Sequence, residues 1–163
     1  MEKGTALVKV RKDSPGVIIP PPMIYALFFV GGIGLNKIVP IHLQAWNPWS
    51  RFAGSSLIVL SFVYLLPSLW KFLRTHNTLI TIRPANSLET NGIYGWTRNP
   101  MYLALLILYT GIAFLVQNYW GIVLSPLVLL VIQEYVIVRE EKYLERAFAQ
   151  EYLNYKKSVR RWV

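Results

Sequence analysis

The sequence predicts an all-α membrane protein: a polytopic helix bundle with about four transmembrane helices and a C-terminal amphipathic helix. Of its 163 residues 54% are hydrophobic and 15% are charged, whereas a soluble domain carries about 25% charged residues. The mean hydropathy is +0.37. The apolar residues are gathered in runs close to the roughly 20 residues that a helix needs to cross the bilayer. We expect one membrane domain over residues 1–163.

Four apolar runs define the predicted spans. Residues 1–22 form a basic arm, in which prolines exclude a continuous helix. Spans one and two fall within 23–70, at about 23–41 and 52–70, and spans three and four fall within 100–138, at about 101–116 and 120–138. The polar loop 71–99 separates the two pairs, and residues 139–163 show the three- and four-residue spacing of an amphipathic helix.

The distribution of Lys and Arg predicts the orientation. The N-terminal arm, the 71–99 loop and the C-terminal segment are basic, whereas the connections 42–50 and 117–118 carry no Lys or Arg. Both termini and the 71–99 loop are therefore predicted to be cytoplasmic, in an integral membrane protein. The net charge of +9 lies outside the apolar runs, which favours contact with anionic lipid headgroups over nucleic acid.

Polar and small residues inside the spans suggest packing or function. Gly31, Gly32 and Gly34 predict a smooth face for close helix packing. Gln133 and Glu134 interrupt the fourth span, and an ionisable group at that depth is either functional or solvated at the interface.

The chain has no cysteine, which excludes thiolate catalysis, disulfides and Cys-ligated metals. The two histidines, His42 and His76, leave little room for a metal site.

The polar stretch 88–102 lies directly before the third span. Its Asn91-Gly92 pair predicts a turn, because glycine accepts a positive φ without steric cost. Pro100 suits the first turn of a helix, where its missing N–H is not needed, and Asn99 before it suits an N-cap. These residues should lie at the mouth of a helix that enters the membrane.

The same stretch combines groups for an anion and for a cation. A helix N-terminus beside Arg98 can hold a carboxylate. The rings of Tyr94 and Trp96 can hold a positive charge. S-adenosylmethionine (SAM) is a small molecule that requires both, because it carries a carboxylate and a sulfonium.

Residues 92–102 resemble the G-x-Y-x-x-x-R-[HN]-P-x-Y signature of the integral-membrane methyltransferases, which include isoprenylcysteine carboxyl methyltransferases and phospholipid N-methyltransferases. A second signature, an acidic pair followed by F-G-x-E-Y-x-x-Y, resembles Glu140-Glu141 and residues 148–155. Ala149 stands where the family usually has glycine, a departure that bears on a helix turn and not on chemistry. The resemblance covers roughly the C-terminal half of the chain.

The resemblance implies a role for each matching residue. The expected cofactor-binding residues are Asn86, Ser87, Leu88, Gly92, Tyr94, Arg98, Asn99, Pro100, Met101, Tyr102 and Glu140. The expected catalytic residues are Glu140, Glu141 and Arg98. The Glu140 carboxylate would accept hydrogen bonds from the SAM ammonium or ribose. Arg98 would pair with the SAM carboxylate or hold Glu140 in place.

The implied activity is transfer of the SAM methyl group to a lipophilic or lipid acceptor, either a phospholipid amine or an isoprenylcysteine-like carboxylate. Val136 stands where isoprenylcysteine-type members carry a substrate-binding Arg, which favours the amine. An amine must lose a proton before it attacks, and Glu134, Glu140 or Glu141 could accept it.

Other functions stay open. One is a non-catalytic lipid-binding or assembly protein that keeps the fold. Another is a reductase, since membrane sterol reductases resemble this family in their C-terminal region, although they are much longer. A transporter is disfavoured, because the short chain shows no inverted halves.

Overall fold

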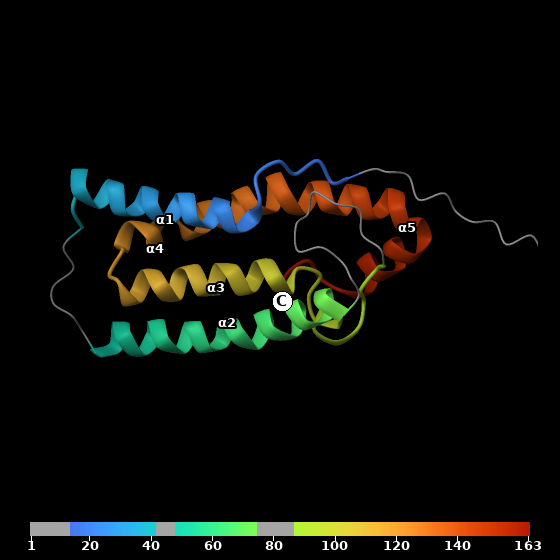
Figure 1. Ribbon diagram of the computed structural model, residues 1–163, viewed down its shortest axis with the longest axis horizontal. Helices are drawn as coiled ribbons and strands as arrows, with labels where there is room; N and C mark the ends of the chain where they lie inside the picture. The colour runs from blue at the N-terminus through green and yellow to red at the C-terminus, as the bar shows by residue number, and fades with distance from the viewer. Residues whose placement is uncertain (1–13, 42–47, 75–86) are drawn as a thin grey trace, which may run out of the picture.

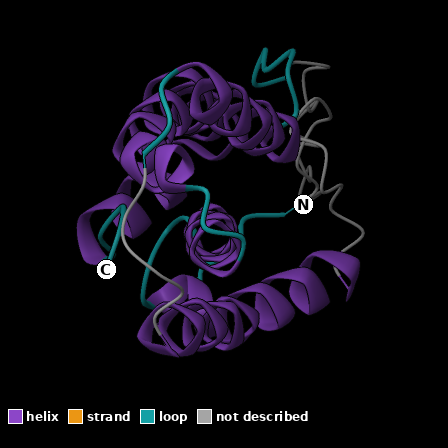
Figure 2. Ribbon diagram, turned by 90° about the vertical axis from the view of Figure 1, so that its left-hand side faces the viewer, coloured by secondary structure: helices purple, strands orange, loops and turns teal. Residues whose placement is uncertain are grey.

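The computed structural model describes residues 14–41, 48–74 and 87–163. Every regular element in these ranges is helical (Figure 2), which confirms the predicted all-α class for the described part of the chain. The elements are α1 (Pro21–Ile38), α2 (Pro48–Arg74), the 3₁₀ turn η1 (Gly92–Gly95), α3 (Pro100–Leu115), α4 (Tyr119–Val131), the π-helix η2 (Ile132–Ile137) and α5 (Val138–Ser158).

The helices α1 to α4 lie side by side and alternate in direction (Figure 1). Helix α3 contacts α1, α2 and α4. Helix α4 continues through η2 into α5, which extends beyond the other helices at one end of the bundle (Figure 1). The loop that precedes α3 lies at this same end, so the topology brings both motif regions together.

Two helices are long and apolar enough to cross a membrane. They are Pro48–Lys71 within α2 and the continuous helix Tyr119–Ser158, whose polar part follows the predicted end of span four at Val138. Helix α3 is apolar but has only 16 residues. Length and composition therefore support membrane association and two spans in the described residues.

Local signals position the helix ends as predicted. Pro100 occupies the first turn of α3, and Asn99 is its N-cap residue. The turn predicted at residues 117–118 is present, because Gln117 has a φ of 56° and the Asn118 side chain accepts a hydrogen bond from the Gly121 N–H at 3.1 Å. The turn therefore ends α3 and starts α4 within a few residues.

Close packing uses fewer glycines of α1 than the sequence suggested. A Cβ on Gly32 would lie 2.8 Å from the Gly121 backbone nitrogen, so this glycine allows α1 to approach α4. A Cβ on Gly31 or Gly34 would meet no atom of the described residues within 4 Å. The prediction of one smooth face from all three glycines is wrong, because helical residues one or two positions apart point in different directions.

Another pair of small residues sets the contact between α2 and α3. A Cβ on Gly54 would lie 2.9 Å from the carbonyl oxygen of Gly111, and a Cβ on Gly111 would lie 3.0 Å from that of Gly54. The backbones of the two helices therefore approach closely at this point, as small residues permit in membrane bundles.

Helix α5 is amphipathic, as predicted, but it ends at Ser158 and not at residue 163. Its buried side chains are Glu141, Tyr143, Tyr152 and Tyr155. Val159 has extended backbone angles (φ −122°, ψ 135°), and from there the chain turns back toward the loop before α3. The helix stops early because the last residues bond to that loop instead of continuing the helical ladder.

Ala149 lies at a kink in α5 with a φ of 43° and a ψ of −118°. Glycine adopts such angles freely, whereas a Cβ makes them costly, by about 1–3 kcal/mol. The alanine at a position where the family usually has glycine is thus a strained residue of the helix turn.

We expect Ala149→Gly to stabilise the protein by about 1–2 kcal/mol, because it removes that strain. Thermal unfolding in detergent measures the change. Ala147→Gly, at an exposed helical position of α5, is the matched control and should destabilise by about 1 kcal/mol. A destabilised Ala149→Gly variant would contradict the expectation.

Candidate active site

The two sequence motifs meet at one hydrogen bond. The hydroxyl of Tyr102, on the first turn of α3, donates to Oε1 of Glu140, near the start of α5, at 2.6 Å. The Tyr25 hydroxyl of α1 donates to the Tyr102 carbonyl oxygen at 2.9 Å and supports this position from the other side. Residues 38 positions apart in the chain thus share one site.

The environment of Glu140 favours its neutral form more than water does. The pKa of Glu140 is raised to about 7, chiefly by burial; the hydrogen bond from Tyr102 opposes this rise, and the nearby charge of Glu141 adds to it. Glu140 lies beyond Val138, outside the predicted fourth span. Its carboxyl group therefore changes charge near neutral pH, and a cationic ligand would favour the ionised form.

Turn η1 places Tyr94 beside this pair. Gly92 begins the turn with a φ of 68°, as the Asn91-Gly92 signal predicted. Tyr94 is buried, and its carbonyl oxygen accepts a hydrogen bond from the Tyr155 hydroxyl at 2.6 Å. Burial raises the pKa of the Tyr94 phenol, and so do the charges of Tyr155, Glu140 and Glu89. The phenol therefore stays protonated and can donate a hydrogen bond.

The other aromatic residue of the stretch, Trp96, behaves differently from Tyr94. Its side chain is 73% exposed. Of the two rings considered for holding a cation, the structure buries only Tyr94 near Glu140.

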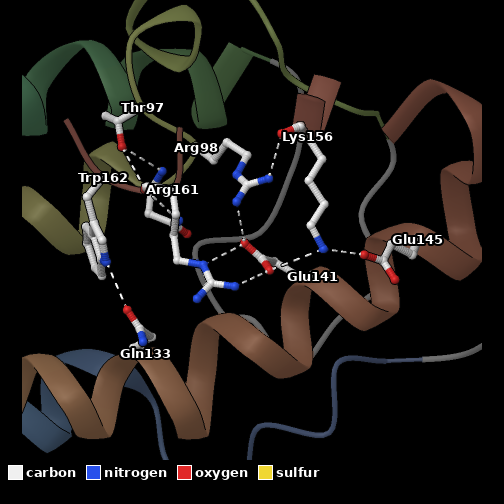
Figure 3. A network of polar contacts seen from close by, with 9 residues as sticks. Thr97, Arg98, Gln133, Glu141, Glu145, Lys156, Arg161 and Trp162 are labelled. Atoms are coloured by element: carbon white, nitrogen blue, oxygen red, sulfur yellow. Dashed lines mark hydrogen bonds and ion pairs between the residues drawn. The ribbon is translucent and has the colours of Figure 1, made fainter. Parts of the chain in front are cut away.

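Glu141 is the centre of an ion-pair network (Figure 3). Its Oε1 lies 3.1 Å from Nη2 of Arg98 and 3.0 Å from Nε of Arg161, and its Oε2 lies 2.7 Å from Nη2 of Arg161. Lys156 Nζ lies 3.7 Å from the same Oε2 and 2.7 Å from Glu145. The side chain of Glu141 is only 7% exposed, so these cations compensate a buried charge.

Arg98 pairs with Glu141 and not with Glu140, which differs from one of the two roles expected for it. Its side chain is 9% exposed, and Nη1 donates to the Lys156 carbonyl oxygen at 3.2 Å. Within the described residues nothing accepts a hydrogen bond from its buried Nε. One donor of the guanidinium is thus left for a further acceptor.

Asn99 occupies the N-cap position directly before α3, but its side chain makes no capping hydrogen bond, so the predicted capping by this side chain is wrong. Its Nδ2 donates to the Arg161 carbonyl oxygen at 3.0 Å, while its backbone N–H donates to Thr97 Oγ1 at 3.2 Å. With a φ of −128° and a ψ of 51°, Asn99 lies outside the β-region angles usual for capping residues. The amide therefore holds the C-terminal segment.

The remaining expected cofactor-binding residues that the structure describes differ in their burial and in their contacts. Ser87 donates to Glu89 at 3.1 Å, and Glu89 pairs with Lys71 at 3.0 Å. Leu88 and Met101 are half-buried, Pro100 is buried and Gly92 is exposed. Asn86 lies outside the described residues.

A comparison with protein families identifies the family of the chain. The family model described as phospholipid methyltransferase matches residues 49–151, which include the whole first motif and, from the second motif, Glu140-Glu141 and residues 148–151. The chain belongs to the phospholipid methyltransferase family. The resemblance to integral-membrane methyltransferases is thereby confirmed.

One relative of this phospholipid methyltransferase family member is an uncharacterised protein from Haemophilus influenzae. It is 40% identical over 63 residues, which are 39% of this chain and the whole of that protein. No solved structure matches the chain significantly.

Sequence reasoning missed several residues that hold the site of this family member together. They are Ser68, Lys71, Glu89, Thr97 and Arg161. Lys71 contributed to the prediction only as part of the basic 71–99 loop, and nothing in the local pattern distinguished Thr97 or Arg161. Their partners lie far away in the chain, so no short-range signal could have identified them.

Proposed function

We propose that this protein transfers the methyl group of SAM to a lipid or other lipophilic acceptor at the membrane surface. The hydrogen bond between Tyr102 and Glu140 carries the proposal, because it joins the two motifs in a chain that belongs to the family. The family supports a membrane methyltransferase, and SAM is the usual donor of such enzymes.

The donor set of the site fits SAM. The Glu140 carboxylate can accept hydrogen bonds from an ammonium group or from ribose hydroxyls, and the Tyr94 ring lies beside it. The buried Nε of Arg98 is a donor without an acceptor among the described residues, and it suits a carboxylate. SAM supplies a methyl group on a sulfonium, which leaves as a neutral thioether. The protein has to orient the acceptor and exclude water.

Of the three candidate carboxylates, Glu140 is the one that a ligand can best use. Both oxygens of Glu141 are engaged by Arg98 and Arg161. Glu134 is exposed in η2 and accepts a hydrogen bond from Gln133 at 3.1 Å. We therefore assign Glu141 to positioning and Glu140 to direct contact with ligand.

A phospholipid amine is the preferred acceptor. Val136 is fully buried at the position where carboxylate-methylating members carry an Arg, so that position offers no charge for an acidic substrate. The acyl chains would reach the site from the bilayer.

We further propose that α1 to α4 all span the membrane, with both termini and the cofactor site in the cytoplasm. The alternating directions of the four helices and the basic residues at the α5 end support this arrangement. The exposed apolar side chains of α1 and α2, among them Leu27, Val30, Val63 and Leu66, support a lipid environment.

The test uses SAM labelled in its methyl group, incubated with the purified protein and a membrane lipid extract. Chromatography should recover the label in a lipid that carries a primary or methylated amine. Binding of neither SAM nor its demethylated product in calorimetry would reject the proposal. Lipid binding without SAM binding would instead indicate the non-catalytic alternative.

We expect SAM affinity to depend on pH through Glu140. With a pKa of about 7 in the free protein, the ionised fraction rises about tenfold between pH 6 and pH 8. The dissociation constant for SAM should therefore be about tenfold higher at pH 6 than at pH 8, as measured by calorimetry. Glu140→Gln should remove this dependence, and an unchanged profile in the variant would contradict the assignment.

A further inference from the structure

The last five residues of the chain, Val159–Val163, bind the loop in front of α3. The carbonyl oxygen of Arg160 accepts a hydrogen bond from the Arg98 N–H at 3.0 Å. The next carbonyl oxygen, that of Arg161, accepts from Thr97 Oγ1 and from Asn99 Nδ2, both at 3.0 Å. Thr97 is fully buried and Asn99 is 8% exposed, so the segment covers these groups.

The side chains of the same segment bind the opposite wall of the site. Arg161 bonds both oxygens of Glu141 on α5, at 3.0 Å and 2.7 Å. Trp162 Nε1 donates to Oε1 of Gln133 in η2 at 3.1 Å. Figure 3 shows both contacts. The C-terminal segment thus joins three parts of the chain: the loop, α5 and the π-helix.

These contacts lie next to the groups proposed for the chemistry. Asn99 directly precedes α3, whose first turn carries Tyr102, and Glu141 directly follows Glu140. One carboxylate of the acidic pair receives the Tyr102 hydroxyl, and the other receives Arg161. The contacts of the segment with Asn99 and Glu141 therefore also fix the distance between Tyr102 and Glu140.

We propose that Val159–Val163 is a clamp and that Arg161 is a positioning residue, which holds Tyr102 and Glu140 in the geometry that binds the methyl donor. This inference rests on the proposed function, since it assigns the clamp to that site. The family match ends at residue 151, so it assigns no role to this segment. The guanidinium of Arg161 is suited to positioning Glu141, because a guanidinium binds both oxygens of one carboxylate in a fixed orientation.

The test compares Arg161→Ala with Lys157→Ala in the full-length protein in detergent. Lys157 is exposed at the end of α5, and its replacement removes the same charge without touching the clamp. Arg161→Ala should raise the KM for SAM at least tenfold and leave the KM for lipid unchanged, whereas Lys157→Ala should change neither more than twofold. Simple loss of folded protein would lower the rate and leave KM unaltered. Equal KM values for SAM in the two variants would overturn the proposal.

Arg161→Lys covers the case in which the alanine variant does not fold. It keeps the charge but replaces the two-pronged contact with a single ammonium. A KM for SAM several-fold above that of the unaltered protein, at an unchanged melting temperature, supports the clamp. A KM equal to that of the unaltered protein overturns it.

Hydrogen exchange separates a failed clamp from a failed proposed function. If the unaltered protein binds no SAM, the proposed function fails, yet exchange of a peptide covering residues 96–102 still reports on the clamp. Arg161→Ala or Arg161→Lys should accelerate exchange in this peptide, because the Arg98 N–H loses its acceptor when the segment detaches. Exchange as slow as in Lys157→Ala would overturn the clamp.

Discussion

Glu140→Gln is expected to weaken SAM binding by roughly 10- to 100-fold at pH 8, where the unaltered carboxyl group is ionised. The amide is nearly isosteric and can still accept the hydrogen bond from Tyr102, so the bundle should remain folded. What it lacks is the negative charge, and a hydrogen bond to a charged group contributes about 1.5–3 kcal/mol. Calorimetry of SAM and of its demethylated product measures the loss.

A matched control comes from the same helix. Glu151 is exposed on α5, and Glu151→Gln removes one negative charge without changing the site. Its affinity for SAM should stay within a factor of two of the unaltered protein. If Glu140→Gln binds SAM as well as Glu151→Gln does, Glu140 is not a cofactor ligand and the site has to be sought elsewhere.

The parts of this structure that the sequence predicted are those with a local cause. Apolar runs predicted four helices, because burial in a bundle or bilayer demands long apolar segments. The ends of α1, α2 and α3 and the start of α4 lie within a few residues of those predicted, whereas the fourth helix continues past residue 138 into α5. Pro100 predicted the start of α3, and the Asn91-Gly92 pair predicted the positive φ of Gly92. Each of these conclusions needs only neighbouring residues.

The features that were not predicted depend on partners distant in the chain. Arg98 was expected to pair with the SAM carboxylate or with Glu140, and only the folded arrangement reveals its ion pair with Glu141. The spacing of apolar residues predicted that the helix continues through Val159–Val163, but α5 ends at Ser158. Gln133 was recognised as a polar interruption of the fourth span, but its partner, Trp162, lies 29 residues away.

The contact between the two motifs was predicted only in part. The resemblance predicted that Tyr102 and Glu140 belong to one site, and the structure places them in direct contact. It did not predict that the two carboxylates of the pair face different partners. Neighbouring residues of a helix point about 100° apart, so one carboxylate reaches Tyr102 while the next reaches the arginines.

Glu141→Ala is expected to destabilise the protein by about 3 kcal/mol. The substitution leaves the Arg98 guanidinium, which is 9% exposed, without its carboxylate, and breaking a buried pair costs about 3–5 kcal/mol. We take the lower end because Arg161, 30% exposed, can still be solvated. The melting temperature in detergent should fall by roughly 6–12 °C.

Glu145→Ala is the control, because it also removes one carboxylate charge from α5 but at a more exposed position. Glu145 pairs with Lys156 at 2.7 Å, but the two side chains are 34% and 36% exposed, and such a surface pair contributes at most about 1 kcal/mol. Its melting temperature should therefore fall by roughly 4 °C or less. If both variants melt at the same temperature, the Glu141 network is not a stabilising centre, and Arg98 must find compensation elsewhere. A larger loss in Glu141→Ala is the expected result, because the Glu141 carboxylate is buried and pairs with three cations, whereas the Glu145 carboxylate is partly exposed and pairs with one.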